Sequence, residues 1–318
     1  MVDLLAVHIA GLTLKTPVIT ASGTFGFAKE FADLVPLDQI GAVCVKGLSL
    51  TPCAGNRGQR VVQTPSGMLN SIGLENPGCA YFLEHILPQL KTYDVPVIAN
   101  IYGHSVEEYA GVARALDVDG ISAVEINISC PNVKQGGLAF GTDPDTAAAV
   151  VRAVKESTHK PVITKLSPNV TDIVRLAKAA ENAGSDALSL INTLMGMKID
   201  IRTQKPVLGN VVGGLSGPAV RPVAVRMVYQ VAQAVHIPLI GMGGITCAED
   251  ALEFMMAGAS AVAVGTANLY QPDTVQTLTQ ALRAYAAEKQ LSNLQDIVGA
   301  ALPNGKQSMP YFQEKEQL

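Results

Sequence analysis

One cysteine stands just past an apolar run, at the start of a polar loop. The segment from Glu125 to Asn132 reads E-I-N-I-S-C-P-N, and a glycine-containing loop follows it. A structural cysteine usually lies within an apolar run, as Cys44 does, whereas Cys130 does not. A free thiol has a pKa near about 8.5, so a small fraction is thiolate at neutral pH. A nucleophilic cysteine usually needs a paired histidine, and the five histidines show no pairing pattern. The sequence therefore favours Cys130 as a general base.

Two lysines close apolar runs that read as strands. Lys46 follows A-V-C-V, and Lys165 follows P-V-I-T. A lysine at the inner end of a buried strand is costly unless its charge meets an anion or an electron-rich ligand. Lys165 could instead form a Schiff base, as lysines do in barrel aldolases. Both interpretations place Lys165 in a functional site, and the first places Lys46 there as well.

Asparagines recur at the ends of successive predicted strands. Asn100, Asn127 and Asn192 lie at or just after three of them, and Asn70 lies in a further polar segment. A carboxamide both donates and accepts hydrogen bonds, which suits a ring with alternating N–H and C=O edges. A pyrimidine or a flavin has such edges.

The last two predicted strands each run into a glycine turn before a helix. Leu239–Ile245 reads L-I-G-M-G-G-I, and Ala261–Ala267 reads A-V-A-V-G-T-A. Glycine lets the backbone approach a phosphate closely, and in barrels a phosphate commonly binds after strands seven and eight. Two such turns in succession favour a phosphate-bearing ligand over simple tight turns.

Eight short β-rich runs alternate with helical stretches and must position these residues. Most are continuously apolar, as expected for strands covered on both faces. Eight alternating units favour a closed (β/α)8 TIM barrel over an open doubly wound sheet, because no Gly-x-Gly-x-x-Gly motif follows the first strand. The expected strands are Val18–Ala21, Ala42–Lys46, Val97–Ile101, Ala123–Ile128, Val162–Leu166, Ala187–Ile191, Leu239–Gly241 and Ala261–Val264, with amphipathic helices such as Thr171–Ala183, Ala219–Val235 and Ala248–Met256.

Segments outside the repeating units suggest a plug at one end of the barrel and long active-site loops at the other. Leu5–Ala10 and Leu12–Lys15 read as a small hairpin around Gly11, which we expect to close the N-terminal end, the bottom, of the barrel. Three segments exceed what a tight turn needs, and all follow strand C-termini, where barrel active sites are built. They are Lys46–Glu75, Ser129–Thr142 and Asn192–Gly217.

Composition narrows the class of protein. The 318 residues are 48% hydrophobic, with no sign of a linker, so we expect one domain spanning residues 1–318. The net charge of −4 comes without a basic block, which argues against nucleic acid. No apolar run reaches the ~18 residues needed to span a bilayer, and no signal peptide is apparent. Five scattered cysteines indicate a reducing cytoplasm rather than disulfides, and no metal site is expected.

Five motifs, in order along the chain, resemble those of class 1 dihydroorotate dehydrogenases. The resemblance runs from about residue 5 to residue 270 and implies an FMN-binding barrel that oxidises dihydroorotate to orotate in de novo pyrimidine (UMP) biosynthesis. The motifs are Met68–Gly78 (M-L-N-S-I-G-L-E-N-P-G), Glu125–Gly137 (E-I-N-I-S-C-P-N-V-K-Q-G-G), Ile191–Met197 (I-N-T-L-M-G-M), Gly213–Ala219 (G-G-L-S-G-P-A) and Gly241–Ile245 (G-M-G-G-I).

The resemblance also implies roles for individual residues. Cys130 would remove a proton from C5 of dihydroorotate, and Lys165 would place positive charge near the anionic edge of the reduced flavin. Substrate binding would involve Lys46, Asn70, Ser71, Ile72, Gly73, Leu74, Asn127, Asn192 and Thr193. FMN binding would involve Ser22, Lys46, Gly47, Asn100, Asn127, Lys165 and Ile191, with Gly217, Gly243, Gly244, Gly265 and Thr266 around the phosphate.

Two of the motifs are similar to the NAD-linked type B branch of the family. They are the stretch C-P-N-V-K-x-G-G and the stretch I-N-T-L-x-G-M. That branch implies a partner electron-transfer subunit carrying FAD and a [2Fe–2S] cluster, in a heterotetramer with two copies of each subunit. The sequence after Lys46 departs from the family, since Gly47-Leu48-Ser49 replaces an expected Ala-Thr or Thr-Thr, and Cys53 and Cys79 match no family role.

Three other functions remain open on the sequence alone. The first is the same flavin chemistry with another acceptor or substrate, as in the fumarate-linked branch or dihydropyrimidine dehydrogenase-like domains. The second is a Schiff-base lyase or isomerase that uses Lys165. The third is a flavin-binding or scaffold subunit without catalytic activity.

Overall fold

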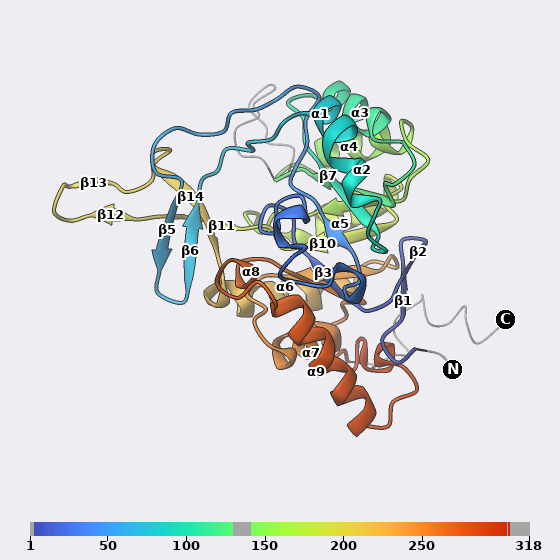
Figure 1. Ribbon diagram of the computed structural model, residues 1–318. Helices are drawn as coiled ribbons and strands as arrows, with labels where there is room; N and C mark the ends of the chain where they lie inside the picture. Colours follow the sequence, from blue (N-terminus) through green and yellow to red (C-terminus); the bar gives the residue numbers. More distant parts are fainter. Residues whose placement is uncertain (1–2, 130–140, 304, 306–318) are drawn as a thin grey trace.

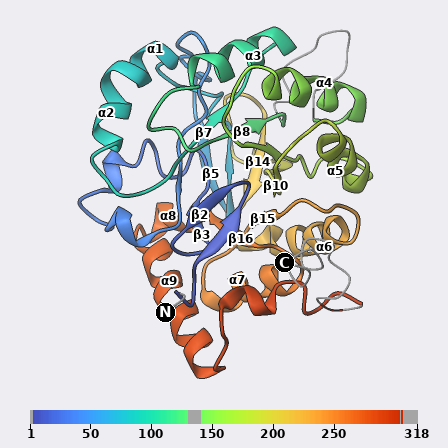
Figure 2. The same ribbon diagram turned by 90° about the vertical axis from the view of Figure 1, so that its right-hand side faces the viewer.

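Eight parallel strands form the centre of the molecule. The computed structural model describes residues 3–129, 141–303 and 305. The sheet order is β3-β16-β15-β10-β9-β8-β7-β4, and a parallel bridge between Ile19 and Ala42 joins its two ends. The predicted (β/α)8 barrel is therefore confirmed (Figures 1 and 2). Its strands are β3 (Val18–Thr20), β4 (Val43–Cys44), β7 (Val97–Ile101), β8 (Ala123–Asn127), β9 (Val162–Lys165), β10 (Ala187–Leu190), β15 (Leu239–Met242) and β16 (Ala261–Val264).

Helices surround the barrel in the order of the chain, as Figure 2 shows in a view from one end of the barrel. Side-chain caps fix three of their starts: Ser105, Asp143 and Asp172 accept backbone N–H groups at the first turns of α3, α4 and α5. The helices are α1 (Cys79–Tyr81), the π-helical turn η3 (Phe82–Ile86), α2 (Leu87–Leu90), α3 (Val106–Ala115), α4 (Pro144–Lys155), α5 (Ile173–Asn182), α6 (Arg221–Ala232), α7 (Ala248–Met256), α8 (Ala267–Tyr270) and α9 (Thr274–Glu288). The 3-10 turns within the described residues are η1 (Lys29–Phe31), η2 (Leu37–Gln39), η4 (Pro218–Val220) and η5 (Leu294–Ile297).

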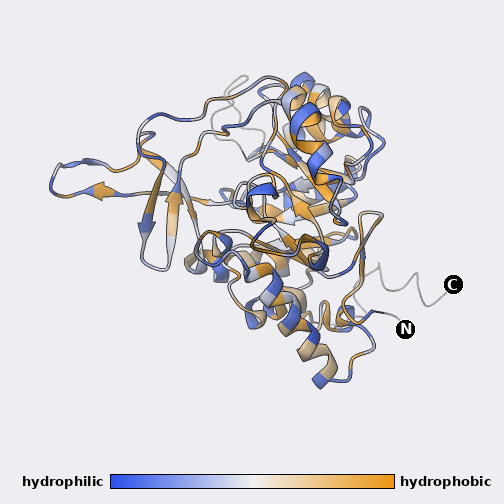
Figure 3. Cartoon of the chain, in the orientation of Figure 1, coloured by the Kyte–Doolittle hydropathy of each residue, from blue (hydrophilic) through white to orange (hydrophobic). Residues whose placement is uncertain are grey.

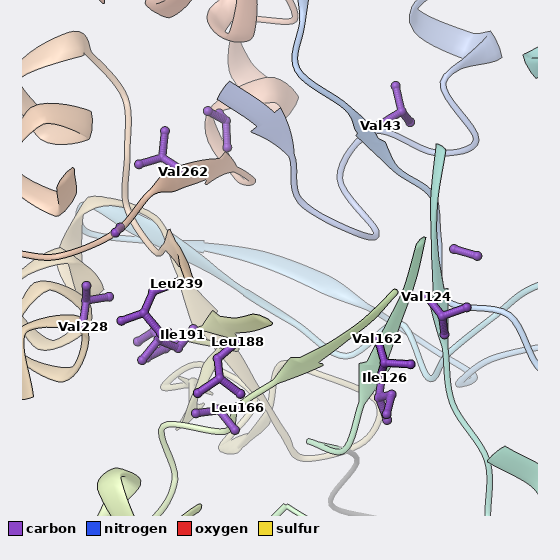
Figure 4. Packing of buried hydrophobic residues seen from close by; sticks show 14 of the residues in the cluster. Val43, Val124, Ile126, Val162, Leu166, Leu188, Ile191, Val228, Leu239 and Val262 are labelled. Atoms are coloured by element: carbon purple, nitrogen blue, oxygen red, sulfur yellow. The ribbon is translucent and has the colours of Figure 1, made fainter. Parts of the chain in front are cut away.

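The barrel strands bury alternate residues in two separate cores. Outward residues such as Val124, Val162 and Leu239 form a large cluster with helix residues such as Val228. Figure 4 labels these residues of the cluster among others. Inward residues such as Ala123 and Ile163 belong to a smaller cluster inside the barrel. Figure 3 shows the same division, with hydrophobic strands inside and more hydrophilic outer helix faces. Because both faces are apolar, the strands read as unbroken hydrophobic runs.

The N-terminal hairpin fills the bottom of the barrel, as predicted. Its strands, β1 (Val7–Ile9) and β2 (Leu12–Leu14), pair in antiparallel fashion. Val7, Ile9 and Leu14 are almost fully buried and share the inner cluster with the inward residues of the barrel strands. The hairpin closes this end to water, so a ligand must enter from the opposite end.

A second, antiparallel sheet projects from the C-terminal end of the barrel, on the left in Figure 1. It has the order β11-β14-β6-β5, and a hairpin of two further strands extends beyond it. The sequence predicted long segments here but not these strands, because glycines and exposed polar residues interrupt the pattern. The strands are β5 (Val61–Thr64), β6 (Gly67–Asn70), β11 (Leu194–Met197), β12 (Ile199–Asp200), β13 (Lys205–Pro206) and β14 (Val212–Ser216).

The predicted elements otherwise differ from the observed ones only at their ends. The ranges Val97–Ile101, Ala261–Val264 and Ala248–Met256 match. The expected strand Ala42–Lys46 shortens to β4, and the expected helix Ala219–Val235 divides into η4 and α6. Among the described residues, no helix has both the length and the apolar character needed to cross a bilayer.

Candidate active site

A layer of polar side chains lies inside the barrel, directly above the apolar plug. Alternate side chains along a strand face the same side, and each of these polar side chains follows an inward-facing residue by two positions. Ala123 faces into the barrel, and so does Glu125 two residues later. Glu125 Oε1 accepts a hydrogen bond from Asn100 Nδ2 at 2.6 Å, and Oε2 accepts one from Ser189 Oγ at 2.7 Å. Lys165 Nζ lies 3.9 Å from Glu125 Oε1. All four side chains are buried. The layer thus combines one cation, one anion and neutral donors below the open end of the barrel.

Cys44 completes this layer as a structural thiol. Its Sγ donates to Glu125 Oε1 at 3.3 Å, and its side chain is buried. Burial, and next the charge of Glu125, raise the pKa of Cys44 well above its ordinary value. The thiol therefore stays protonated and serves as a donor, in line with the structural role that its apolar surroundings predicted.

Lys46 lies at the rim of the barrel, above β4. Its Nζ is 3.6 Å from Glu75 Oε2, which also accepts a hydrogen bond from Arg60 at 2.9 Å. The backbone N–H of Lys46 donates to the carbonyl of Gly26. Gly47 follows, and a Cβ built there would lie 2.9 Å from Asn100 Oδ1. These contacts orient Lys46 toward the loop that contains Glu75.

The loop after β6 is held in an unusual conformation by side chains around it. Gly73 and Leu74 both have positive φ, and a Cβ on Gly73 would lie 2.4 Å from the backbone nitrogen of Asn56. Asn56 Nδ2 donates to Ser71 Oγ at 2.9 Å, and Cys53 Sγ donates to the carbonyl of Gly73 at 3.4 Å. Cys53 therefore supports this loop, a role that the sequence did not suggest. Asn70 ends β6, and four more of the predicted site residues lie in this loop: Ser71, Ile72, Gly73 and Leu74.

Two asparagines at the ends of β8 and β10, the strands on either side of β9, meet at the open end. Asn192 Nδ2 donates to Asn127 Oδ1 at 3.2 Å, and Asn192 Oδ1 accepts the backbone N–H of Thr193 at 2.8 Å. Asn127 pairs with Lys165 across β8 and β9. The structure thus brings together Asn100, Asn127, Lys165 and Asn192, which the sequence placed at strand ends.

The glycine turns after β15 and β16 border the same end of the barrel. Gly244 has φ +82°, and a Cβ there would lie 2.7 Å from the carbonyl of Gly217, which itself has φ +97°. Gly243 also has positive φ. Thr266 Oγ1 donates to Ser216 Oγ at 2.8 Å. Only glycine fits these positions without strain, so the turns form a backbone cradle.

An acidic residue beside the cradle was missed by the sequence analysis. Asp250 Oδ2 accepts hydrogen bonds from the backbone and hydroxyl of Thr246, both at 2.8 Å, and Asp250 also pairs with Arg221. Burial alone would raise the pKa of Asp250, but the Thr246 hydrogen bonds and the Arg221 guanidinium outweigh it and lower that pKa. Asp250 therefore stays ionised and fixes the turn after Gly244.

Comparison with known proteins identifies the family. The family model for dihydroorotate dehydrogenase matches residues 4–285. The chain belongs to the dihydroorotate dehydrogenase family. Among its relatives is the "Dihydroorotate dehydrogenase B (NAD(+)), catalytic subunit" of Geotalea daltonii, 57% identical over 93% of this chain and 97% of the relative. Proteins with the same name in Desulforudis audaxviator and Geobacter sulfurreducens are 58% and 56% identical, over 94% and 93% of this chain and 98% and 97% of theirs.

The described part of the site fits the flavin that this dihydroorotate dehydrogenase family uses. Asn100 Oδ1 is buried and accepts no hydrogen bond from any described residue. An isoalloxazine N–H is the kind of donor that such an oxygen requires. The turns at Gly217 and Gly244 have no room for a Cβ, so their backbone carries no side chain, as a close phosphate site requires.

Not every predicted residue can be placed. Cys130 lies outside the described residues. Ser22 follows β3 and Ile191 follows β10, both at the open end of the barrel. Gly265 follows β16, where a Cβ would make only ordinary contacts, the nearest at 3.5 Å. Cys79 lies buried in α1, and burial raises its pKa to about 11, so it is a structural thiol.

Asn76 and Tyr102 brace the loop that holds the predicted substrate residues. Asn76 Nδ2 donates to the carbonyl of Leu74 at 2.9 Å, and the Tyr102 hydroxyl donates to the same carbonyl at 3.1 Å. Burial raises the pKa of Tyr102 far above its ordinary value, so the hydroxyl keeps its proton. Ser49 Oγ donates to the Tyr102 hydroxyl, which links the loop to the segment after β4.

Loss of this brace should weaken substrate binding more than it slows flavin reduction. Asn76→Ala removes a buried hydrogen-bond donor, a loss that costs about 1–3 kcal/mol, or roughly 5–150-fold. We expect the dihydroorotate concentration for half-maximal flavin reduction in stopped flow to rise by such a factor. Tyr102→Phe, which keeps the ring, should give a smaller rise in the same direction. Unchanged half-saturation in both variants would contradict this role.

Proposed function

We propose that this chain is the FMN-dependent catalytic subunit of an NAD-linked dihydroorotate dehydrogenase, which oxidises dihydroorotate to orotate in de novo pyrimidine biosynthesis. The observation that carries the proposal is the buried Asn100 oxygen, which accepts no hydrogen bond from a described residue. It lies at the open end of a barrel of this family, where Asn100 and Lys165 both approach the Glu125 carboxylate. An acceptor and a cation in one polar layer suit the N–H and carbonyl groups of a flavin.

In the proposed reaction, the chain's residues bind, orient and deprotonate the substrate. Asn70, Asn127 and Asn192 would hydrogen-bond the amide and carboxylate groups of dihydroorotate, and Lys46 would face both ligands. Cys130 would take the proton from C5 as general base. Bound FMN would supply the acceptor for the hydride from C6. Gly217, Gly243, Gly244, Gly265 and Thr266 would hold the FMN phosphate, and Ser22, Gly47 and Ile191 would line its ring.

The Schiff-base alternative is disfavoured by the surroundings of Lys165. Lys165 Nζ lies 3.9 Å from the buried carboxylate of Glu125, and this ion pair engages the amine that a Schiff base would need. Lys165 is therefore suited to bind an anionic edge rather than to attack a carbonyl.

One experiment tests the proposed function directly. The purified chain should absorb as an FMN protein, and its flavin absorbance should bleach when dihydroorotate is added without oxygen. Dihydrouracil, which lacks the carboxylate, should not bleach it. A colourless chain that takes up no FMN, or a flavin that dihydrouracil reduces equally fast, would overturn the proposal.

A partner subunit should be required for NAD⁺ reduction. The chain has no Gly-x-Gly-x-x-Gly turn for a dinucleotide, and its five cysteines are too scattered for an iron–sulfur ligand set. We therefore expect the chain alone to reduce dyes with dihydroorotate but not NAD⁺. A second subunit with FAD and a [2Fe–2S] cluster would restore NAD⁺ reduction, in a heterotetramer of two copies each.

The test follows dihydroorotate-dependent NADH formation by its absorbance, with the chain rigorously free of partner. NADH formation at rates comparable to dye reduction would contradict the two-subunit arrangement. Efficient fumarate reduction by the lone chain would instead assign it to the fumarate-linked branch. Size-exclusion chromatography with and without the partner would report the assembly.

A further inference from the structure

The buried carboxylate of Glu125 has no assigned part in the proposed reaction. Its side chain is 4% exposed and lies at the centre of the polar layer. Three neutral donors reach it, from Asn100, Ser189 and Cys44, at 2.6, 2.7 and 3.3 Å. Lys165 Nζ, 3.9 Å away, provides the nearby positive charge. Burying a carboxylate costs desolvation free energy, so a buried carboxylate with three hydrogen-bond donors needs an explanation.

Glu125 determines which way the Asn100 amide points. An ionised carboxylate only accepts hydrogen bonds, so the group that Asn100 turns toward it must be Nδ2. Asn100 Oδ1 is then forced to the other side, near Gly47, where no described residue donates to it. Glu125 thereby makes Asn100 an obligatory acceptor toward the proposed flavin.

Glu125 also balances the charge of Lys165. The two side chains are 4% and 7% exposed, so solvent screens their fields only weakly. With both ionised, the pair is neutral, and the positive field of Lys165 in the barrel is reduced. Without the carboxylate, a full positive charge would remain buried near any ligand at the open end.

We propose that Glu125 is a positioning residue and counter-ion for the flavin: it sets the Asn100 amide as an acceptor and offsets the charge of Lys165, and so lowers the midpoint potential of the bound FMN. This inference rests on the proposed function. Reduction adds negative charge to the flavin, and an unopposed cation favours the reduced form. The carboxylate limits that preference.

The test compares two substitutions that separate charge from shape. Glu125→Gln keeps the size of the side chain but removes the charge, and its amide can donate to Asn100. Glu125→Asp keeps the charge but shortens the side chain. The midpoint potential is measured without oxygen against a reference dye, and FMN affinity is measured by titrating the apoprotein. Neither readout depends on turnover.

The expected result is a higher midpoint potential in Glu125→Gln. The ratio of reduced to oxidised flavin at a fixed potential should rise at least tenfold, which is about 30 mV for a two-electron couple. Glu125→Asp should remain within threefold of the wild-type ratio. Oxidised FMN should bind more weakly to Glu125→Gln, because Asn100 is no longer held as an acceptor.

Other results would overturn the inference. A Glu125→Gln ratio within threefold of wild type, or a shift in Glu125→Asp as large as in Glu125→Gln, would leave Glu125 with only a packing role. If the wild-type chain binds FMN and is reduced by dihydroorotate, such a result refutes this inference alone. If the wild-type chain binds no FMN, the proposed function fails and this inference fails with it.

A second pair of variants covers the case in which Glu125→Gln does not fold because it leaves Lys165 unpaired. Lys165→Met leaves the carboxylate unpaired, whereas Lys165→Met with Glu125→Gln removes both charges. The double variant should have the higher potential of the two. Equal or reversed potentials would contradict a counter-ion role for Glu125.

Discussion

Cys130→Ala is expected to leave FMN bound and to slow its reduction by dihydroorotate about 10²–10⁴-fold, the usual cost of losing a general base. The proton on C5 of dihydroorotate is weakly acidic, and alanine offers no group to accept it. Among the five cysteines, Cys44 and Cys79 are buried thiols whose pKa burial raises, so neither can substitute as the base. The measurement is the anaerobic rate of flavin bleaching in stopped flow.

Two further variants make the result specific to the base. Cys130→Ser should retain a trace of activity that rises with pH, because a hydroxyl is a much weaker acid than a thiol and must lose its proton to act. Cys79→Ala serves as the matched control, since it removes a buried thiol whose pKa burial raises. Flavin reduction by Cys130→Ala within threefold of the wild-type rate at neutral pH would exclude Cys130 as the base.

The strand pattern explains how much of the fold could be predicted. Outward residues such as Val124 pack under the helices and inward residues such as Ala123 pack on the hairpin plug, so both faces are apolar and the strands stand out in the sequence. The projecting sheet has no such signal. Its strands carry exposed residues such as Met195 and Met197, and its pairing joins β6 to β14 across more than a hundred residues.

Glu125 shows why part of the site escaped prediction. Its strand reads in the sequence as one apolar run followed by a polar end, which directs attention to Asn127 and Cys130. Alternation along the strand puts Ala123, Glu125 and Asn127 on its inward face. This pattern would have pointed to the Glu125 carboxylate. Its partners could not have been found in this way, because Asn100, Lys165 and Ser189 come from three other strands. Only closure of the barrel brings them together.

A carboxylate introduced at Gly265 should expel FMN by repelling its phosphate. Gly244→Asp should do the same, but its Cβ would also lie 2.7 Å from the carbonyl of Gly217, so charge and strain would act together. At Gly265 the nearest contact of a Cβ would be the ordinary 3.5 Å to Ala21 Cβ. Gly265→Asp and Gly265→Ala therefore differ chiefly in charge. The pair isolates the electrostatic effect of the proposed phosphate site.

The size of the effect follows from the repulsion between like charges. Two unit charges 4 Å apart repel by about 4 kcal/mol at an effective dielectric constant of 20, which corresponds to roughly 10³-fold in Kd. Gly265→Asp should thus purify without FMN, whereas Gly265→Ala should keep it. FMN content is measured by absorbance after heat release, and circular dichroism checks that both variants fold. A folded Gly265→Asp with a full complement of FMN would place the phosphate elsewhere, and loss of FMN from Gly265→Ala would show that shape rather than charge governs this turn.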